Sequence, residues 1–446
     1  MIVTEIELLP AGLVGEEGHC WTFPGLDPAI APLRHSPLGS RFTLFEDDRQ
    51  LGPDHARLPK LRETGGGQFF YWNNAVYFST SDNSDPRING RRYRLVIEQP
   101  GDGEVWMPTV MSVGLTYLCN LTCRICRTGN LKGTLTDACI DKLIEEAIPH
   151  LTQLRIDVAG EPTLHQAKFR RIVTAATKLN VPVFLCTNAT LIDPDLAAFI
   201  CDSSINIIQL SVDSPNRERL EWVRRGASFD AVVMGIRNLV AARLASGRTN
   251  LQFTIHAALL ESTIDDMPDL VRFAHDLGVE EVNCMFGYIH DHMDPDWSVF
   301  WDQPRQDRRI EEAKAVAAEL GVKFMAWQTA AAAKPETETP PPPLAVERAP
   351  CHYLYQWTYV DPSGSLIPCC ISSFQTGNLS EHSFEEIWRG ETYMELRRTH
   401  NTATPSDPKC AVCYLRSDWA QESYKSFFHH SHWPAVRKRL NLPEQE

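Results

Sequence analysis

Three cysteines stand close together in the run Cys119-Asn-Leu-Thr-Cys123-Arg-Ile-Cys126. They follow an apolar segment, Val113 to Leu118, that is typical of a buried strand. A closed zinc site needs four protein ligands, and a cubane iron–sulfur cluster normally takes four cysteines. Three ligands therefore predict a cluster with one iron left open to a group that is not protein. A zinc site completed by a distant histidine and plain buried thiols are the alternatives.

The C-x3-C-x2-C spacing resembles the signature of the radical S-adenosylmethionine (SAM) superfamily. The resemblance implies that the three cysteines hold a [4Fe–4S] cluster whose open iron is chelated by the amino and carboxylate groups of SAM. It also implies that electron transfer cleaves SAM to a 5′-deoxyadenosyl radical, which abstracts a hydrogen from the substrate. In such an enzyme the cofactor supplies the chemistry, and the protein supplies position and exclusion.

Further motifs of the same family follow in order. The run Val158-Ala159-Gly160-Glu161-Pro162 resembles its G-G-E-P motif, with Ala in the first position. Here Gly160 permits a close approach of backbone to the SAM ammonium, and Glu161 offers a balancing carboxylate. The run Thr187-Asn188-Ala189-Thr190 resembles T-N-G-T, and Ser211-Val212-Asp213 resembles S-I-D.

The resemblance makes Asn188, Ser211 and Asp213 candidate contacts to the ribose or carboxylate of SAM. It makes Arg224 a candidate partner for the SAM carboxylate, since arginine suits bidentate recognition. Each of these residues alone is equally well explained as a cap or a turn residue. Their order along the chain favours the binding site.

Four more cysteines lie near the C-terminus: Cys351, Cys369, Cys410 and Cys413. Four thiolates complete a closed cubane, and a structural zinc site is the alternative. The pattern resembles the SPASM/twitch extensions of radical SAM enzymes, in the shorter form with one auxiliary [4Fe–4S] cluster. The adjacent Cys370 is able to replace Cys369 as the ligand.

Residues that act on the substrate are harder to find in the sequence. Cys284, His256 and Tyr288 are weak catalytic candidates because they lie near the fifth and sixth strand ends. Cys284 facing the interior would suit a donor of a hydrogen atom or a proton. Packing residues are the alternative for each of them.

The chain divides into four parts on its composition. Residues 1–108 are aromatic, β-branched and turn-rich, which predicts a β-rich domain. Residues 109–333 alternate apolar runs with amphipathic helices, which predicts an α/β fold, a wound sheet or a barrel. The resemblance implies a partial (β/α)6 radical SAM barrel, with active-site residues at the carboxyl ends of the strands. A proline-rich linker at 334–349 and a small cysteine-bearing domain at 350–446 complete the chain. The predicted barrel strands are Val110–Leu118, Leu154–Val158, Pro182–Thr187, Ile205–Val212, Leu251–Ala257 and Glu281–Phe286.

Composition limits the partners. A formal charge of −14 over 446 residues argues against binding to bulk nucleic acid. No run of 18 apolar residues is present, so no membrane span is expected. The thirteen cysteines are clustered and no basic leader precedes them, which favours metal ligands in a reducing cytoplasm. The resemblance adds an external electron donor such as flavodoxin or ferredoxin.

Three functions fit these features. The first is radical oxidation or epimerisation of a sugar or similar small polar metabolite. The second is maturation of a ribosomally made peptide, although the β-rich N-terminal part lacks a clear winged-helix pattern for recognising a peptide. The third is a zinc-stabilised binding protein, which leaves the ordered motifs unexplained.

Overall fold

The computed structural model describes residues 2–26, 41–52, 58–72, 75–99, 105–129, 131–326, 351, 353–370, 372, 374–402, 404–410, 413 and 427–441. The chain forms two compact units, one of Met1–Met107 with Ala349–Gln356 and one of Pro108–Arg348 with Trp357–Glu446. The proline-rich stretch predicted at 334–349 lies outside the described residues. The division into four domains remains a proposal.

The first unit is β-rich, as the sequence predicts. It contains two four-stranded antiparallel sheets with the strand orders β1-β8-β4-β5 and β2-β3-β7-β6. Alternating apolar residues of both sheets, among them Leu44, Phe78 and Leu95, form one buried core. Its elements are β1 (Ile2–Glu7), β2 (Val14–Gly15), β3 (Trp21–Phe23), β4 (Arg41–Glu46), β5 (Arg49–Gln50), α1 (Leu58–Glu63), β6 (Phe69–Trp72), β7 (Ala75–Phe78), β8 (Tyr93–Gln99) and α9 (Tyr353–Gln356).

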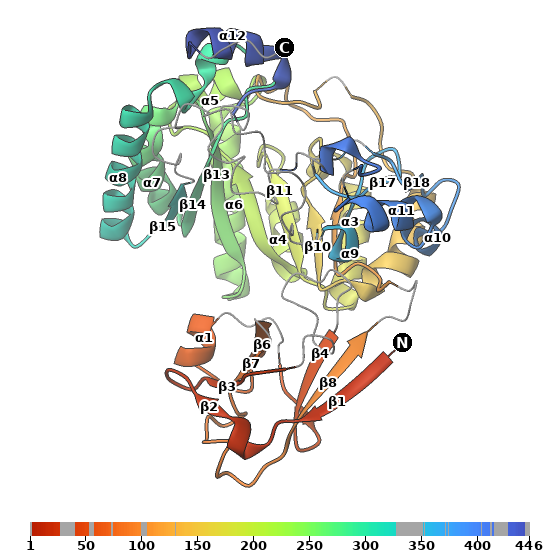
Figure 1. Cartoon of the computed structure of the whole chain (residues 1–446). Helices are drawn as coiled ribbons and strands as arrows, with labels where there is room; N and C mark the ends of the chain where they lie inside the picture. Colours follow the sequence, from red (N-terminus) through yellow and green to blue (C-terminus); the bar gives the residue numbers. More distant parts are fainter. Residues whose placement is uncertain are drawn as a thin grey trace. The chain divides into compact units, whose positions relative to one another are not determined.

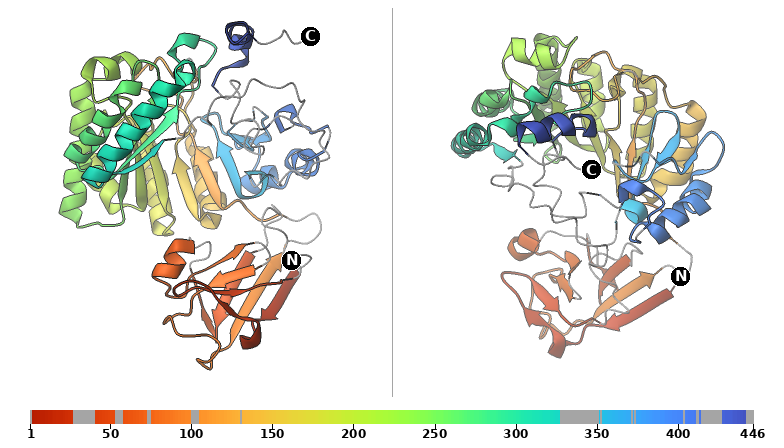
Figure 2. Two further views of the ribbon diagram at one scale, coloured as in Figure 1. Left: turned by 60° about the vertical axis from the view of Figure 1, so that its left-hand side comes forward. Right: turned by 45° about the horizontal axis from the view of Figure 1, so that its top comes forward.

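The second unit is built on a ten-stranded sheet, and its helices cover one face of the parallel part (Figures 1 and 2). The seven strands β9 to β15 are parallel and neighbour one another in chain order. Six of them fall at the predicted strands of a partial (β/α)6 barrel, and β15 is a seventh strand that the sequence pattern did not predict. They are β9 (Val110–Val113), β10 (Gln153–Ile156), β11 (Val183–Thr187), β12 (Ile205–Ser211), β13 (Gln252–Leu259), β14 (Glu281–Phe286) and β15 (Lys323–Ala326).

Helices between these strands follow the sequence pattern and its caps. They are α2 (Asp137–Lys142), α3 (Gln166–Lys178), α4 (Pro194–Asp202), α5 (Arg217–Val223), α6 (Phe229–Ser246), α7 (Met267–Leu277) and α8 (Gln303–Leu320). The Asp193 carboxylate accepts a hydrogen bond from Leu196 N at 2.8 Å and begins α4. Left-handed Gly247, Gly278 and Gly321 end α6, α7 and α8. None of the described helices is long and apolar enough to cross a membrane.

The first barrel strand ends earlier than the sequence predicts. Apolar residues continue to Leu118, but β9 ends at Val113. Beyond it the chain pairs with a loop instead of a strand, since Leu135 N bonds to Leu115 O at 2.9 Å and Tyr117 N to Gly133 O at 2.9 Å. An apolar run is compatible both with a longer strand in the sheet and with pairing to a loop, so hydrophobicity alone does not distinguish the two.

The C-terminal part adds strands to the same sheet. Strand β16 (Trp357–Val360) pairs in parallel with β9, and β17 (Ser365–Ile367) and β18 (Gly377–Asn378) follow in antiparallel order. Lys142 bonds to the carbonyls of Leu379 and His382 at 2.6 and 2.8 Å, which joins α2 to this region. Helices α10 (Phe384–Trp388), α11 (Glu391–Thr399) and α12 (Trp433–Arg439) complete it.

The last described segment packs beside the cysteine loop. Phe427 and Phe428 are buried in an apolar cluster with Ile289 and Phe300, and Ile125 packs against that cluster. Backbone bonds of 2.8 Å run from Ile289 N to Phe427 O and from His429 N to Ile289 O. Residues some 300 positions apart in the chain thus support the loop between the second and third cysteines.

Replacing Phe428 by alanine should therefore lower the free energy of unfolding by about 3–5 kcal/mol, because the change leaves a cavity in a closed apolar cluster. Denaturant unfolding of the purified protein measures this change. Met234→Ala, at a side chain that is 56% exposed on α6, is the matched control and should change stability little. Equal effects of the two variants would contradict the packing role.

Candidate active site at the carboxyl ends of the strands

The loop after β9 carries Cys119, Cys123 and Cys126. Thr122 N and Arg124 N bond to the carbonyls of Arg225 and Val223 at 2.8 Å each, so the loop is tied to the end of α5. Within the described ranges, no three His, Cys, Asp or Glu side chains converge as closely as a single metal ion requires. A cubane cluster holds its cysteines on separate iron atoms and does not need such convergence.

Two of the three thiols, those of Cys119 and Cys123, have hydrogen-bond donors or a cation beside them. Leu121 N lies 3.4 Å from Cys119 Sγ, and the Asn188 amide nitrogen lies 3.8 Å from the same sulfur. Burial raises the pKa of Cys123 to about 11, and the charge of Arg224 opposes that rise. Hydrogen-bond donors and a cation around the sulfurs stabilise the deprotonated form that an iron–sulfur cluster requires. The residues present therefore fit the cluster.

Gly160 lies directly against the cysteine loop. A Cβ atom at this position would stand 2.2 Å from Thr116 O and 2.6 Å from Leu118 O, and the φ angle of Gly160 is +59°. The next residue, Glu161, donates its backbone N–H to Leu118 O at 3.0 Å. Only glycine allows this approach of two backbones. Gly160 thus fixes the peptide that precedes Cys119.

The Glu161 side chain joins two strand ends. Its carboxylate accepts hydrogen bonds from Thr163 N (3.1 Å), Thr163 Oγ1 (2.6 Å), Thr187 Oγ1 (2.8 Å) and Asn188 N (2.8 Å). Burial raises the pKa of this carboxyl, and these donors oppose the rise. Glu161 is only 2% exposed. The carboxylate therefore connects the ends of β10 and β11 rather than pointing outward.

Asn188 connects the end of β11 to the cysteine loop. Its amide nitrogen bonds to Asn120 Oδ1 at 3.0 Å, and its oxygen accepts from Thr190 N at 3.0 Å. Asn120 in turn donates to Thr190 Oγ1 at 2.8 Å. No sequence motif singled out Asn120. Its position directly after Cys119 was the signal that could have identified it.

Arg224 and Asp213 form a buried ion pair. Arg224 Nε lies 2.7 Å from Asp213 Oδ2, and their side chains are 12% and 0% exposed. Asp213 Oδ1 also accepts from Ala258 N at 2.9 Å. The aspartate thereby holds the guanidinium next to Cys123, and the role of Arg224 toward the SAM carboxylate stays a prediction.

The inner face of the sheet carries polar side chains at the strand ends. Ser211 is paired across the strands with His256, and burial lowers the pKa of that histidine. Ser211 Oγ lies 3.7 Å from Cys186 Sγ. Cys284 is paired with Ala257, the neighbour of His256, and so lies on the opposite face of the sheet, fully buried. The thiol on the inner face is that of Cys186, which the sequence did not single out.

Tyr288 lies beyond the end of β14 and is 39% exposed. Its ring meets that of His290 edge to face at 5.0 Å. His292 Nε2 lies 3.1 Å from the carbonyl oxygen of Arg124, within the cysteine loop. These contacts place the loop after β14 beside the cysteines.

The later cysteines fall in both units. Cys351 belongs to the first unit, whereas Cys369, Cys410 and Cys413 belong to the second. Cys369 Sγ accepts a hydrogen bond from Ser372 N at 3.3 Å. Ser372 also bonds to Asp407, whose carbonyl accepts from Cys410 N at 2.9 Å. The segments of Cys369 and Cys410 are therefore connected in the second unit.

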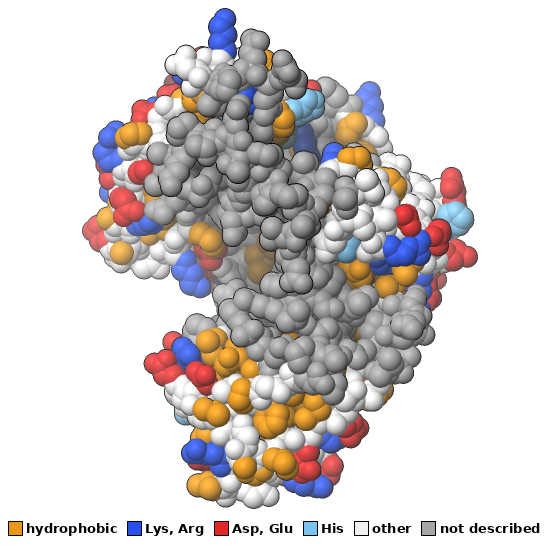
Figure 3. All heavy atoms as spheres, in the orientation of Figure 1, with side chains coloured by type: hydrophobic (Ala, Val, Ile, Leu, Met, Phe, Trp, Pro, Cys, Tyr) orange, Lys and Arg blue, Asp and Glu red, His pale blue; other side chains and the backbone are white. Residues whose placement is uncertain are grey.

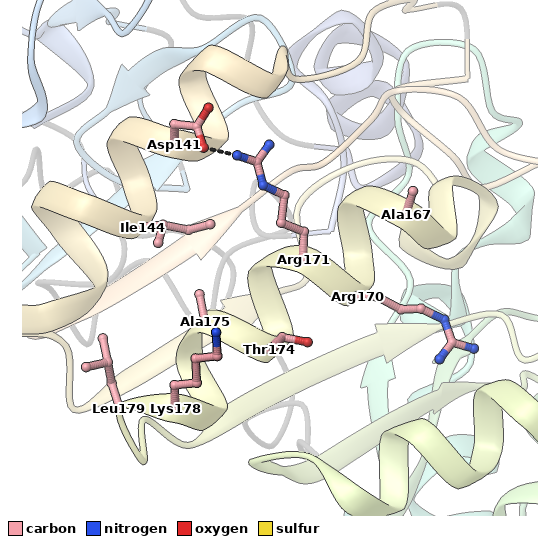
Figure 4. A pocket seen from close by; sticks show the side chains of 9 residues that line it. All are labelled: Asp141, Ile144, Ala167, Arg170, Arg171, Thr174, Ala175, Lys178 and Leu179. Atoms are coloured by element: carbon pink, nitrogen blue, oxygen red, sulfur yellow. Dashed lines mark hydrogen bonds and ion pairs between the residues drawn. The ribbon is translucent and has the colours of Figure 1, made fainter.

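A surface hollow of about 670 Å³ lies on the helical side of the sheet, between α2 and α3 (Figure 4). Arg171 crosses it to pair with Asp141, and Lys178 lines its edge. None of the predicted site residues lines it. Basic and acidic side chains alternate over the visible helices of this unit (Figure 3).

Comparison with known proteins decides the family. The radical SAM superfamily model matches residues 113–274, and the model of the SPASM iron–sulfur cluster-binding domain matches residues 351–414. The chain therefore carries a radical SAM domain followed by a SPASM domain. Its radical SAM domain implies a [4Fe–4S] cluster and SAM, and its SPASM domain implies auxiliary iron–sulfur clusters. The family is one of enzymes, in contrast to the zinc-stabilised binding protein considered above.

Individual relatives match different lengths of this radical SAM protein. Mycofactocin maturase MftC of Mycobacterium ulcerans is 31% identical over 153 residues, which is 33% of this chain and 41% of the maturase. The match thus spans about two fifths of that relative. AdoMet-dependent heme synthase of Methanosarcina barkeri is 24% identical over 69% of this chain and 88% of the synthase. Streptococcus suis SuiB bound to S-adenosylmethionine shares the fold, with a TM-score of 0.50 and 16% identity over 69% of this chain and 71% of SuiB.

We expect Gly160→Ala to reduce the iron bound after anaerobic reconstitution severalfold, because the added methyl group forces the backbone before Cys119 to move. Iron and labile sulfide analysis measures the loss. Gly247→Ala is the matched control, since Gly247 has a φ of +66° but open space around it. If both variants kept the same iron content, the docking of the two backbones would not matter for the cluster.

Proposed function

We propose that this radical SAM enzyme modifies a peptide. The observation that carries the enzyme class is the cysteine loop held at the strand ends by Gly160, Glu161 and Asn188. The match to mycofactocin maturases and the SPASM domain support a maturase function. SuiB, whose fold this chain shares, has also been solved bound to the precursor peptide SuiA.

In this proposal Cys119, Cys123 and Cys126 hold the SAM-binding [4Fe–4S] cluster. The bound cluster and SAM supply radical chemistry that abstracts a hydrogen from the substrate. Gly160 and Asn188 hold the loop in place, and the Asp213–Arg224 pair sets the charge beside Cys123. An external donor such as flavodoxin or ferredoxin delivers the electron, and the enzyme works in the cytoplasm.

Radical oxidation or epimerisation of a sugar or similar small molecule is the second candidate. The match to heme synthase supports it, because that match extends over most of the synthase. Both candidate functions use the same cluster, and they differ only in the substrate that the radical attacks.

The test uses the full chain, reconstituted anaerobically and reduced in the presence of SAM. The substrates offered are short synthetic peptides of varied sequence. Mass spectrometry should find a changed peptide mass together with 5′-deoxyadenosine, and Cys123→Ala should lower both to background because the cluster loses a ligand. Cys20→Ala, in the buried core of the first unit, is the control and should retain both. Formation of 5′-deoxyadenosine with an unchanged peptide would reject the peptide substrate and leave the enzyme class standing.

We also propose that Cys351, Cys369, Cys410 and Cys413 hold one auxiliary [4Fe–4S] cluster. The backbone N–H that points at Cys369 favours this thiol over that of its exposed neighbour Cys370.

Cys369→Ser should therefore remove roughly half of the reconstituted iron, the share of one cubane of two. Cys370→Ser is the matched control and should retain the full amount. The reverse result would assign Cys370 as the ligand, and unchanged iron in both variants would contradict the auxiliary site.

A further inference from the structure

Arg155 on β10 is held in a fixed orientation on the inner face of the sheet. Its guanidinium carbon lies 3.7 Å from the ring centroid of Phe184 and 5.5 Å from that of Trp357. The Trp357 indole N–H donates to Ser112 Oγ at 3.2 Å, which fixes the second ring. Trp357 belongs to β16, so the C-terminal strands supply one wall of this arrangement. Two aromatic rings thus orient the guanidinium before any ligand arrives.

Asp157 occupies one edge of this guanidinium. Arg155 Nε donates to Asp157 Oδ2 at 2.7 Å, and the two side chains are 21% and 18% exposed. The terminal guanidinium nitrogens of Arg155 form no further hydrogen bond to any residue that the structure describes. Asp157 Oδ1 is buried and has no hydrogen-bond partner among the described residues. The pair therefore offers donors from Arg155 beside an unused acceptor on Asp157.

The pair shares its surroundings with the cysteine loop. Burial raises the pKa of Cys186 to about 11, with Ser211 and Arg224 opposing the rise and Asp157 adding to it. Asp157 lies three residues before Gly160, whose backbone meets the carbonyls of Thr116 and Leu118 just before the cysteine loop. Arg155 and Asp157 alternate along the chain with the buried Leu154 and Ile156, and therefore face away from the helices.

Charge decides which ligand fits. Arg155 and Asp157 neutralise each other, so an ionised group would meet attraction from one and repulsion from the other. A buried polar atom without a partner costs free energy, and a ligand that satisfies both members gains most. A neutral group with an adjacent C=O and N–H matches the donors of Arg155 and the acceptor of Asp157. A primary carboxamide, such as the side chain of Asn or Gln in a peptide, presents its C=O and one N–H on the same edge and is such a group.

We propose that the Arg155–Asp157 pair is a recognition site for a side-chain carboxamide of the peptide substrate, with Arg155 donating to its carbonyl oxygen and Asp157 accepting its N–H. Phe184 and Trp357 act as positioning residues for Arg155. This inference rests on the proposed function, because it assigns recognition of the proposed peptide substrate to two residues, Arg155 and Asp157. It makes the C-terminal strands part of the substrate site through Trp357.

The test measures binding to the full reconstituted protein with SAM, without turnover. The probe is N-acetylalaninamide, a primary carboxamide, compared with N-acetylalanine methyl ester, which lacks the carboxamide N–H groups, and with the carboxylate N-acetylalanine. Saturation-transfer NMR titrations should show preference for the amide in the wild type. Arg155→Met should weaken amide binding about tenfold or more, since charge-assisted hydrogen bonds are lost.

Asp157→Asn separates recognition from folding. Removal of the carboxylate leaves Arg155 without its counter-charge, so preference should change from the amide to the carboxylate probe. A purely structural role would not reverse the preference. Arg170→Met is the matched control, because Arg170 also stacks on a phenylalanine (Phe199) and pairs with an aspartate (Asp195), but on the outer helices. Melting temperature and iron content show whether each variant is folded.

Equal binding of amide and ester, a carboxylate preference in the wild type, or an equal loss in Arg170→Met would overturn the inference. Amide recognition without modification of any peptide would reject the proposed function alone. Peptide modification that is unchanged in Asp157→Asn would reject the recognition site alone.

Discussion

The close contact between two backbones at Gly160 is the constraint on which the site depends. The cysteine loop belongs to no strand or helix, so its shape depends on what touches it. Gly160 comes within reach of the carbonyls of Thr116 and Leu118, and Glu161 anchors the approaching segment through four donors from its own turn and from the end of β11. A buried carboxylate with every bond satisfied is stable only in one arrangement of these segments. The position of Cys119 follows from that arrangement.

Two alanines near this contact adopt backbone conformations that usually favour glycine. Ala159 and Ala189 have φ angles of +56° and +63°. Both stand where the motifs of the family have glycine. Each of these conformations costs of order 1 kcal/mol. The hydrogen bonds of the neighbouring Glu161 and Asn188 maintain them. At both positions the alanine thus keeps a backbone conformation that glycine would adopt with less strain.

The C-terminal part is integrated into the barrel rather than attached to it. Strand β16 extends the sheet beside β9, and Tyr117 bonds to Asp361 at 3.0 Å. Through Trp357, the same strand reaches the inner face at Arg155. A change in the cysteine-bearing C-terminal region therefore affects the first barrel strand and the loop that follows it, because they share one hydrogen-bonded sheet.

The sequence alone placed the cysteine triplet and predicted the parallel order of the barrel strands and the β-rich first unit. These features depend on local spacing and on periodicity, which a single chain displays directly. Tertiary structure alone decided which groups meet. It paired Arg224 with Asp213, turned Glu161 inward, placed Cys186 rather than Cys284 on the inner face, and set Trp357 beside Arg155. Such choices depend on strand register and on contacts between residues hundreds of positions apart, and no local pattern records them.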